Sequence, residues 1–129
     1  MKVCIIGAGA SGIAACKVMK EHKIDFDCYE KGSDIGGLWW YNNDNGMNSI
    51  YKSLCINTSK QMMSYSDYPM PDNYPDYPHH TLIHRYFRSY AEHFGFIPHI
   101  RFNTTVTHIE KKGKQYLVSC GMEQPKAYD

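Results

Sequence analysis

The pattern of apolar and polar positions at the N-terminus predicts a strand, a helix and a second strand. Residues 3–6 form a continuous apolar run, which is typical of a strand buried on both faces of a parallel sheet. Apolar residues recur at helical spacing over residues 11–22, and a second strand is expected over residues 26–30. Together these elements make a βαβ unit of about thirty residues.

The C-terminal part of the chain predicts one more helix and two more strands. A helix is expected over residues 81–94, with Thr81 as its cap and Gly95 as its stop. Residues 100–110 and 115–120 are typical of two strands joined by a short turn. We therefore predict an α/β fold in which a parallel sheet is followed by a β-hairpin or meander.

Residues 31–80 separate these two parts and hold neither helical nor strand periodicity for long. Eight of the eleven tyrosines lie between Tyr41 and Tyr90, and such aromatic content argues against disorder. The stretch from Tyr65 to Tyr77 allows two interpretations: a wall that keeps water from a cofactor, or an aromatic cover over one side of the sheet. We favour the cover, because loops rich in Tyr and Pro often pack in this way.

Composition and charge narrow the class of protein. The 129 residues, 43% of them hydrophobic and 21% charged, fit a single globular domain over residues 1–129. A net charge of +1 argues against nucleic-acid binding and against a basic membrane-binding face. Five cysteines without a Cys-x-x-Cys pair argue for a reducing compartment, and the absence of a long apolar stretch adds to the expectation of a cytoplasmic protein.

The first candidate binding motif is Gly7-Ala8-Gly9-Ala10-Ser11-Gly12, a G-x-G-x-x-G pattern between the first predicted strand and the first predicted helix. Gly7 allows a tight turn, Gly9 lets a pyrophosphate approach the backbone, and Gly12 lets the helix pack closely on the strand. The first amides of the helix and the positive end of its dipole suit phosphate groups. The motif therefore predicts a dinucleotide site.

Glu30 follows Gly12 by eighteen residues, at the end of the second predicted strand. A carboxylate there can accept hydrogen bonds from ribose hydroxyls and would repel a 2′-phosphate, although Lys31 beside it weakens that argument. FAD or NAD is thus favoured over NADP as the first-bound dinucleotide. Gly36-Gly37, Leu38 and two tryptophans follow where an NAD domain would start another helix, which favours the longer, planar FAD.

These motifs, together with the phrase Asn57-Thr58-Ser59-Lys60 within residues 53–71, make the chain resemble the N-terminal part of the flavin-containing monooxygenases of the N,N-dimethylaniline monooxygenase type. The resemblance implies a Rossmann-like FAD/NAD(P)-binding domain with three layers, incomplete at its C-terminus and without the NADPH domain. No second G-x-G-x-x-G motif occurs in the chain.

The resemblance also implies which residues contact the cofactor. It implies that Asn57 lies beside the isoalloxazine and helps to hold the oxygenated flavin. It places Ile56 and Thr58 at the flavin or the nicotinamide, Glu30 with Lys31 at the adenosine ribose, and Val106 at the adenine. The remaining cofactor contacts, at the pyrophosphate and toward the flavin ring, are Gly7, Ala8, Gly9, Ala10, Ser11, Gly12, Gly37, Leu38 and Trp39.

The implied chemistry is FAD reduction by NADPH, addition of O2 at flavin C4a, and transfer of one oxygen from the hydroperoxide to a small-molecule amine or sulfide. Three alternatives stay open: Baeyer-Villiger oxidation, a flavoprotein reductase, and a non-catalytic nucleotide-binding remnant. A homo-oligomer is also left open. No metal is expected, because His79, His80 and His84 lack convincingly spaced further ligands.

Overall fold

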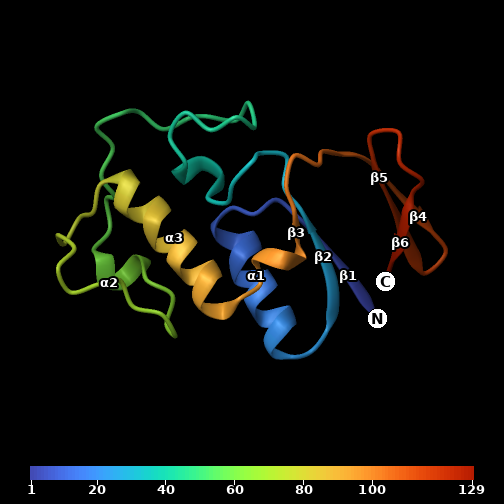
Figure 1. Cartoon of the computed structure of the whole chain (residues 1–129), viewed down its shortest axis with the longest axis horizontal. Helices are drawn as coiled ribbons and strands as arrows, with labels where there is room; N and C mark the ends of the chain where they lie inside the picture. Colours follow the sequence, from blue (N-terminus) through green and yellow to red (C-terminus); the bar gives the residue numbers. More distant parts are fainter.

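The computed structural model describes residues 1–129 and contains two three-stranded sheets (Figure 1). The parallel sheet has the order β1-β2-β3 and pairs Lys2 with Asp25 and Ile6 with Tyr29. The second sheet is an antiparallel meander in the order β4-β5-β6. The strands are β1 (Lys2–Ile6), β2 (Asp25–Tyr29), β3 (Ile100–Arg101), β4 (Val106–Lys112), β5 (Gln115–Cys120) and β6 (Lys126–Tyr128).

The helices and the meander lie on opposite sides of the parallel sheet. Helix α1 (Ala10–Glu21) covers one face of the sheet, and α3 (His80–Phe94) packs against α1 (Figure 1). The meander covers the other face, so the three predicted layers and the predicted βαβ unit are confirmed. The shorter helices are η1 (Gly37–Trp39), α2 (Lys60–Met63) and η2 (Ile97–His99).

Alternating side chains on β2 explain the two packed faces. Phe26 and Cys28 belong to the main core between sheet and helices, whereas Tyr29 belongs to a smaller core under the meander. β1 divides in the same way, with Ile5 toward the helices and Cys4 toward the meander. A strand covered on both faces needs apolar residues at consecutive positions, and the sequence of β1 has them.

Helix α3 forms because its apolar residues share one face. Ile83, Phe87 and Tyr90 are almost fully buried there. The helix ends at Gly95, whose φ of 64° is left-handed, so the predicted helix and its stop are confirmed. Nζ of Lys20, from α1, donates hydrogen bonds to the carbonyls of Phe94 and Gly95, each at 2.7 Å, and thereby joins the two helix ends.

The predicted cap of α3 is wrong. His79, not Thr81, is the N-cap residue, and its Nδ1 accepts a hydrogen bond from the Thr81 amide. The second ring nitrogen of His79 contacts the Lys52 carbonyl at 2.8 Å. Because this distant contact holds the ring, the imidazole can take the place that a Ser or Thr hydroxyl usually has.

The single strand predicted over residues 100–110 is also wrong. Arg101 ends β3 in the parallel sheet, and Val106 begins β4 in the meander. Between them Asn103 adopts a φ of 52°, a left-handed conformation that interrupts an extended strand. β6 pairs with β5 and completes the meander, although no residue range was predicted from the sequence for this third strand.

The tyrosine-rich stretch is a cover, but it lies on the helices and not on the sheet. Tyr65 and Tyr68 stack on Tyr86 of α3 and also pack against Tyr90 in tilted and edge-on contacts. The Tyr65 hydroxyl also donates a 2.6 Å hydrogen bond to the Ala10 carbonyl in α1. The stretch therefore seals the outer side of the helix layer.

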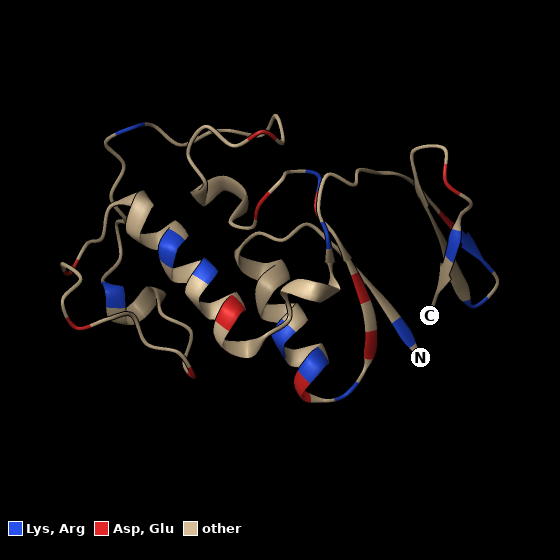
Figure 2. Cartoon of the chain, in the orientation of Figure 1, with Lys and Arg blue, Asp and Glu red and all other residues tan.

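Charges are spread over the surface. Figure 2 shows basic and acidic residues interspersed over helices, strands and loops. Among the helices, none has both the length and the apolar character that crossing a membrane requires.

A buried polar cluster joins the two sheets. The hydroxyls of Tyr29 and Tyr128 lie 2.6 Å apart, and the Tyr128 hydroxyl donates to Asp27 at 2.7 Å. Nζ of Lys126 donates to the same carboxylate at 2.5 Å. Burial pushes the pKa of Asp27 upward, but the hydrogen bonds from Lys126 and Tyr128 and the positive charges of Lys126 and Lys2 together outweigh burial and lower that pKa. Asp27 is thus held as a carboxylate at neutral pH.

The first prediction concerns this cluster. Tyr128→Phe should lower the free energy of unfolding by about 1–2 kcal/mol, because it removes the hydrogen-bond partner of the buried Tyr29 hydroxyl and one of the hydrogen-bond donors to Asp27. Urea denaturation measures the change. Tyr116→Phe on the exposed side of β5 is the matched control and should stay within about 0.5 kcal/mol of wild type. Equal stability of the two variants would contradict the role of the cluster.

Candidate cofactor-binding site

The glycine motif forms the turn between β1 and α1. The Gly7 amide donates to the Tyr29 carbonyl at 2.8 Å, and its φ of 91° is in the region that only glycine adopts readily. A Cβ on Gly12 would lie 1.9 Å from the Gly7 carbonyl oxygen. The turn can therefore close only with glycine at position 12.

The first turn of α1 presents unpaired amides. Gly9 caps the helix without a side-chain hydrogen bond, and the first amide that bonds back is that of Ile13, to the Gly9 carbonyl. The amides of Ala10, Ser11 and Gly12 have no acceptor within the chain. Free amides at the positive end of a helix dipole form a favourable place for an anion such as phosphate.

Glu30 connects the glycine turn to the end of β2. Only 4% of the residue is exposed, and Oε2 accepts a hydrogen bond from the Ala8 amide at 2.6 Å. Oε1 accepts one from the Gly32 amide at 2.7 Å. Each carboxylate oxygen can accept a further hydrogen bond, so Glu30 keeps the capacity to bind a ribose hydroxyl.

Two adjoining cavities lie over this turn, and together we call them the glycine-loop groove. The first, of about 360 Å³, is lined by Ile6, Gly7, Gly9, Tyr29, Glu30, Lys31, Gly37, Leu38, Asn45, Met47, Thr104, Thr105 and Val106. The second, of about 340 Å³, is lined by Ile6, Gly7, Gly9, Ala10, Ser11, Gly12, Gly36, Gly37, Leu38 and Trp39. The shared residues make the two cavities neighbours along the carboxyl end of β1.

The groove thus brings together most of the predicted cofactor residues from three separate parts of the chain. Ala8 lies just beneath it and is fully buried, with its amide on Glu30. Ile56, Asn57 and Thr58 line neither cavity. The Ile56 side chain is part of the core, while Asn57 and Thr58 are exposed.

Sequence reasoning missed six residues that line the first cavity: Ile6, Tyr29, Asn45, Met47, Thr104 and Thr105. The Thr104 amide donates to the Glu30 carbonyl at 2.9 Å, a contact that depends on the turn at Asn103. Asn45-Gly46 is a turn dipeptide that could have drawn attention, and the Asn45 side chain accepts a hydrogen bond from the Met47 amide at 2.8 Å.

The neighbouring histidines contact backbone carbonyls. Nε2 of His79 and Nε2 of His80 lie 2.8 and 3.0 Å from the Lys52 carbonyl, and Nε2 of His84 lies 3.0 Å from the Ile35 carbonyl. No group of three or more His, Cys, Asp or Glu side chains is arranged to hold a metal ion.

Comparison with known sequences identifies the family. The profile of the family described as Flavin-binding monooxygenase-like matches residues 1–122. The chain belongs to this family. It is 47% identical over 113 residues to flavin-containing monooxygenase 5 of Rattus norvegicus, covering 86% of this chain and 21% of that protein. It is 38% identical over 138 residues to dimethylaniline monooxygenase (N-oxide-forming) 2 of Mus musculus, covering 99% of this chain and 26% of that protein. The chain therefore spans about a quarter or less of the length of these relatives.

Solved structures of monooxygenases share the fold. The S-allyl-L-cysteine S-oxygenase of Allium sativum superposes with a TM-score of 0.88 at 24% identity, covering 98% of this chain and 34% of that one. A steroid monooxygenase bound to NADP gives a TM-score of 0.82 at 23% identity, covering 98% of this chain and 24% of that one. The predicted Rossmann-like fold class is confirmed.

The second prediction compares two glycines of the family motif. Gly12→Ala should lower the free energy of unfolding by more than about 3 kcal/mol, because the new methyl group would overlap the Gly7 carbonyl. Gly9→Ala should change it by less than about 1 kcal/mol, since its Cβ would lie 3.6 Å from Cα of Gly37, an ordinary contact. Thermal denaturation followed by circular dichroism separates the two. Comparable melting temperatures for both variants would contradict the geometry.

Proposed function

We propose that the chain forms the FAD-binding part of a flavin-dependent monooxygenase that uses NADPH and O2 to oxygenate a small amine or sulfide. The observation that carries this proposal is the glycine-loop groove, in which a buried carboxylate and unpaired helix amides occur together in a member of this family. These two features suit the two polar parts of a dinucleotide, its ribose and its pyrophosphate.

The residues of the groove suit FAD in sequence along its length. Glu30 would accept ribose hydroxyls, with Lys31 and Val106 at the adenosine end. The amides of residues 10–12 would bind the pyrophosphate, and Leu38 and Trp39 line the end that would lead to the flavin ring. Bound FAD would supply hydride acceptance from NADPH and reaction with O2.

Asn57 is our candidate for the residue beside the flavin. Its side chain is exposed and forms no hydrogen bond within the chain, so both its donor and its acceptor are available to a ligand. The exposed Thr58 could contribute a hydroxyl, and Ile56, whose side chain is buried, could contribute only backbone atoms.

We also infer a cytoplasmic location. All five cysteines are free, among them three that are buried and serve as small apolar residues, as a reducing compartment permits. A homo-oligomer remains a proposal that gel filtration with light scattering would test.

The third prediction is that the purified chain binds FAD. We expect a visible absorption band of protein-bound flavin and quenching of FAD fluorescence on titration. Glu30→Gln should weaken FAD binding by at least about tenfold, because it replaces a carboxylate that accepts hydrogen bonds with an amide. Glu110→Gln on the exposed β4 is the control and should bind like wild type. A folded, colourless wild-type chain that does not quench FAD would overturn the proposed function.

The fourth prediction concerns Asn57. Asn57→Leu should bind FAD within about twofold of wild type, because Asn57 lies outside the groove. In a full-length enzyme that carries this sequence, mixing the reduced flavin with oxygen should release hydrogen peroxide faster from the variant, because the amide that would help to hold the oxygenated flavin is gone. A peroxidase-coupled dye measures the hydrogen peroxide. Equal peroxide release by the two proteins would exclude the role.

A further inference from the structure

The loop that follows β2 touches the glycine turn backbone to backbone. The Gly36 amide donates to the Ala8 carbonyl at 2.9 Å. Gly37 has a φ of 53°, and a Cβ there would lie 2.9 Å from Cα of Gly9. Since Gly9 and Gly37 line both cavities, the shape of the groove depends on where this loop is held.

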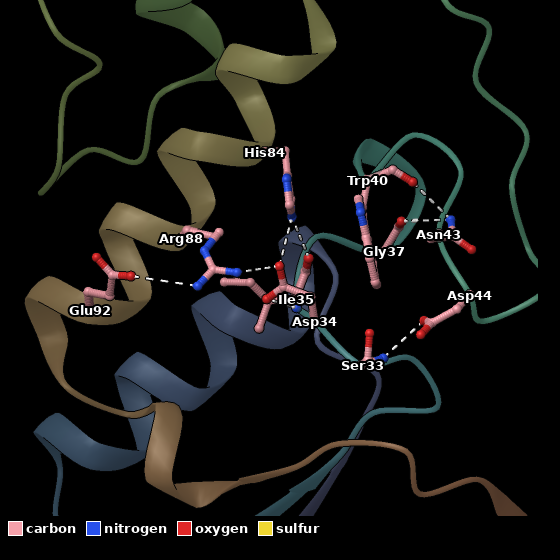
Figure 3. A network of polar contacts seen from close by, with 10 residues as sticks. All are labelled: Ser33, Asp34, Ile35, Gly37, Trp40, Asn43, Asp44, His84, Arg88 and Glu92. Atoms are coloured by element: carbon pink, nitrogen blue, oxygen red, sulfur yellow. Dashed lines mark hydrogen bonds and ion pairs between the residues drawn. The ribbon is translucent and has the colours of Figure 1, made fainter.

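Two side chains of helix α3 contact the loop just before the double glycine. Figure 3 shows His84 and Arg88 extending from α3 toward Asp34 and Ile35. Nε2 of His84 lies 3.0 Å from the Ile35 carbonyl oxygen and 3.4 Å from Oδ2 of Asp34. Arg88, one helical turn later, pairs with the same Oδ2 of Asp34. The other oxygen of Asp34 accepts a hydrogen bond from the Ile35 amide at 2.9 Å.

The His84 ring also fits the space beside the double glycine. A Cβ on Gly36 would lie 2.7 Å from Cδ2 of His84, so the ring occupies the place that a side chain at position 36 would need. The Trp40 ring lies parallel to the His84 ring, with ring centroids 5.8 Å apart and an angle of 5° between the planes (Figure 3). With 20% of its side chain exposed, His84 is largely enclosed by these contacts.

We propose that His84, together with Asp34 and Arg88, is a positioning residue of the cofactor site. It lines neither cavity and acts through Gly36 and Gly37, which it presses against the glycine turn. With its proton on Nε2, the ring donates to the Ile35 carbonyl and fixes the backbone one residue before the double glycine. The assignment to FAD rests on the proposed function, whereas the holding of the loop does not.

The test uses two readouts on the 129-residue chain. Without FAD, His84→Leu should speed amide hydrogen exchange of Gly36, measured by NMR, by about tenfold, while amides of β1 and β2 keep their rates. With FAD, the same variant should bind about tenfold more weakly by fluorescence quenching. His84→Gln keeps a side-chain N–H donor and should restore both values toward wild type. Arg85→Gln, exposed on the same helix, is the control and should change neither.

The two readouts separate a failure of the proposed function from a failure of the role of His84. If wild type fails to bind FAD, the proposed function falls, and Gly36 exchange still decides whether His84 holds the loop. If wild type binds FAD and a folded His84→Leu chain shows unchanged exchange or unchanged affinity, the positioning role is overturned. Should His84→Leu not fold, Asp34→Asn decides in its place, because it removes the charge that pairs with Arg88 while keeping the size of the side chain. Unchanged Gly36 exchange in that variant would overturn the role as well.

Discussion

The structure depends on a backbone contact between two glycine segments that are far apart in the sequence. An added Cβ at Gly37 would lie 2.9 Å from Cα of Gly9, and the Gly36 amide donates to the Ala8 carbonyl at 2.9 Å. Glu30 completes the contact, because its carboxylate bonds the Ala8 amide in one segment and the Gly32 amide at the start of the other. The groove therefore has walls of backbone, which brings amide groups within reach of a ligand without intervening side chains.

Each outer layer stabilises this contact from its own side. On the helix side, Lys20 joins the ends of α1 and α3, so the helix that carries His84 is fixed to the helix that begins at the glycine turn. On the meander side, Tyr29 lines the groove and also bonds Tyr128 of β6. A change in either layer can thus reach the groove through a few named contacts.

Periodicity was enough to predict the βαβ unit and α3, because strands buried on both faces and helices with one apolar face leave their pattern in the sequence. It failed where the outcome depended on distant partners. His79 caps α3 because the Lys52 carbonyl holds its ring, and β3 ends early because Asn103 turns the chain toward the meander. Of the site, the glycine and carboxylate positions were predictable from spacing, but Thr104 and Asn45 reach the groove only through tertiary contacts.

The phrase around Asn57 shows how scaffold and function can share one segment. Ile56 is in the core, Ser59 caps α2, and Nζ of Lys60 donates to the carbonyls of Asp72 and Tyr74 at 2.8 and 2.7 Å. Structural contacts thus account for the residue types of Ile56, Ser59 and Lys60. Thr58 and Asn57 have none, since they are exposed and make no side-chain hydrogen bond. The contacts of Ile56, Ser59 and Lys60 therefore position Asn57 while leaving its amide free to meet a ligand.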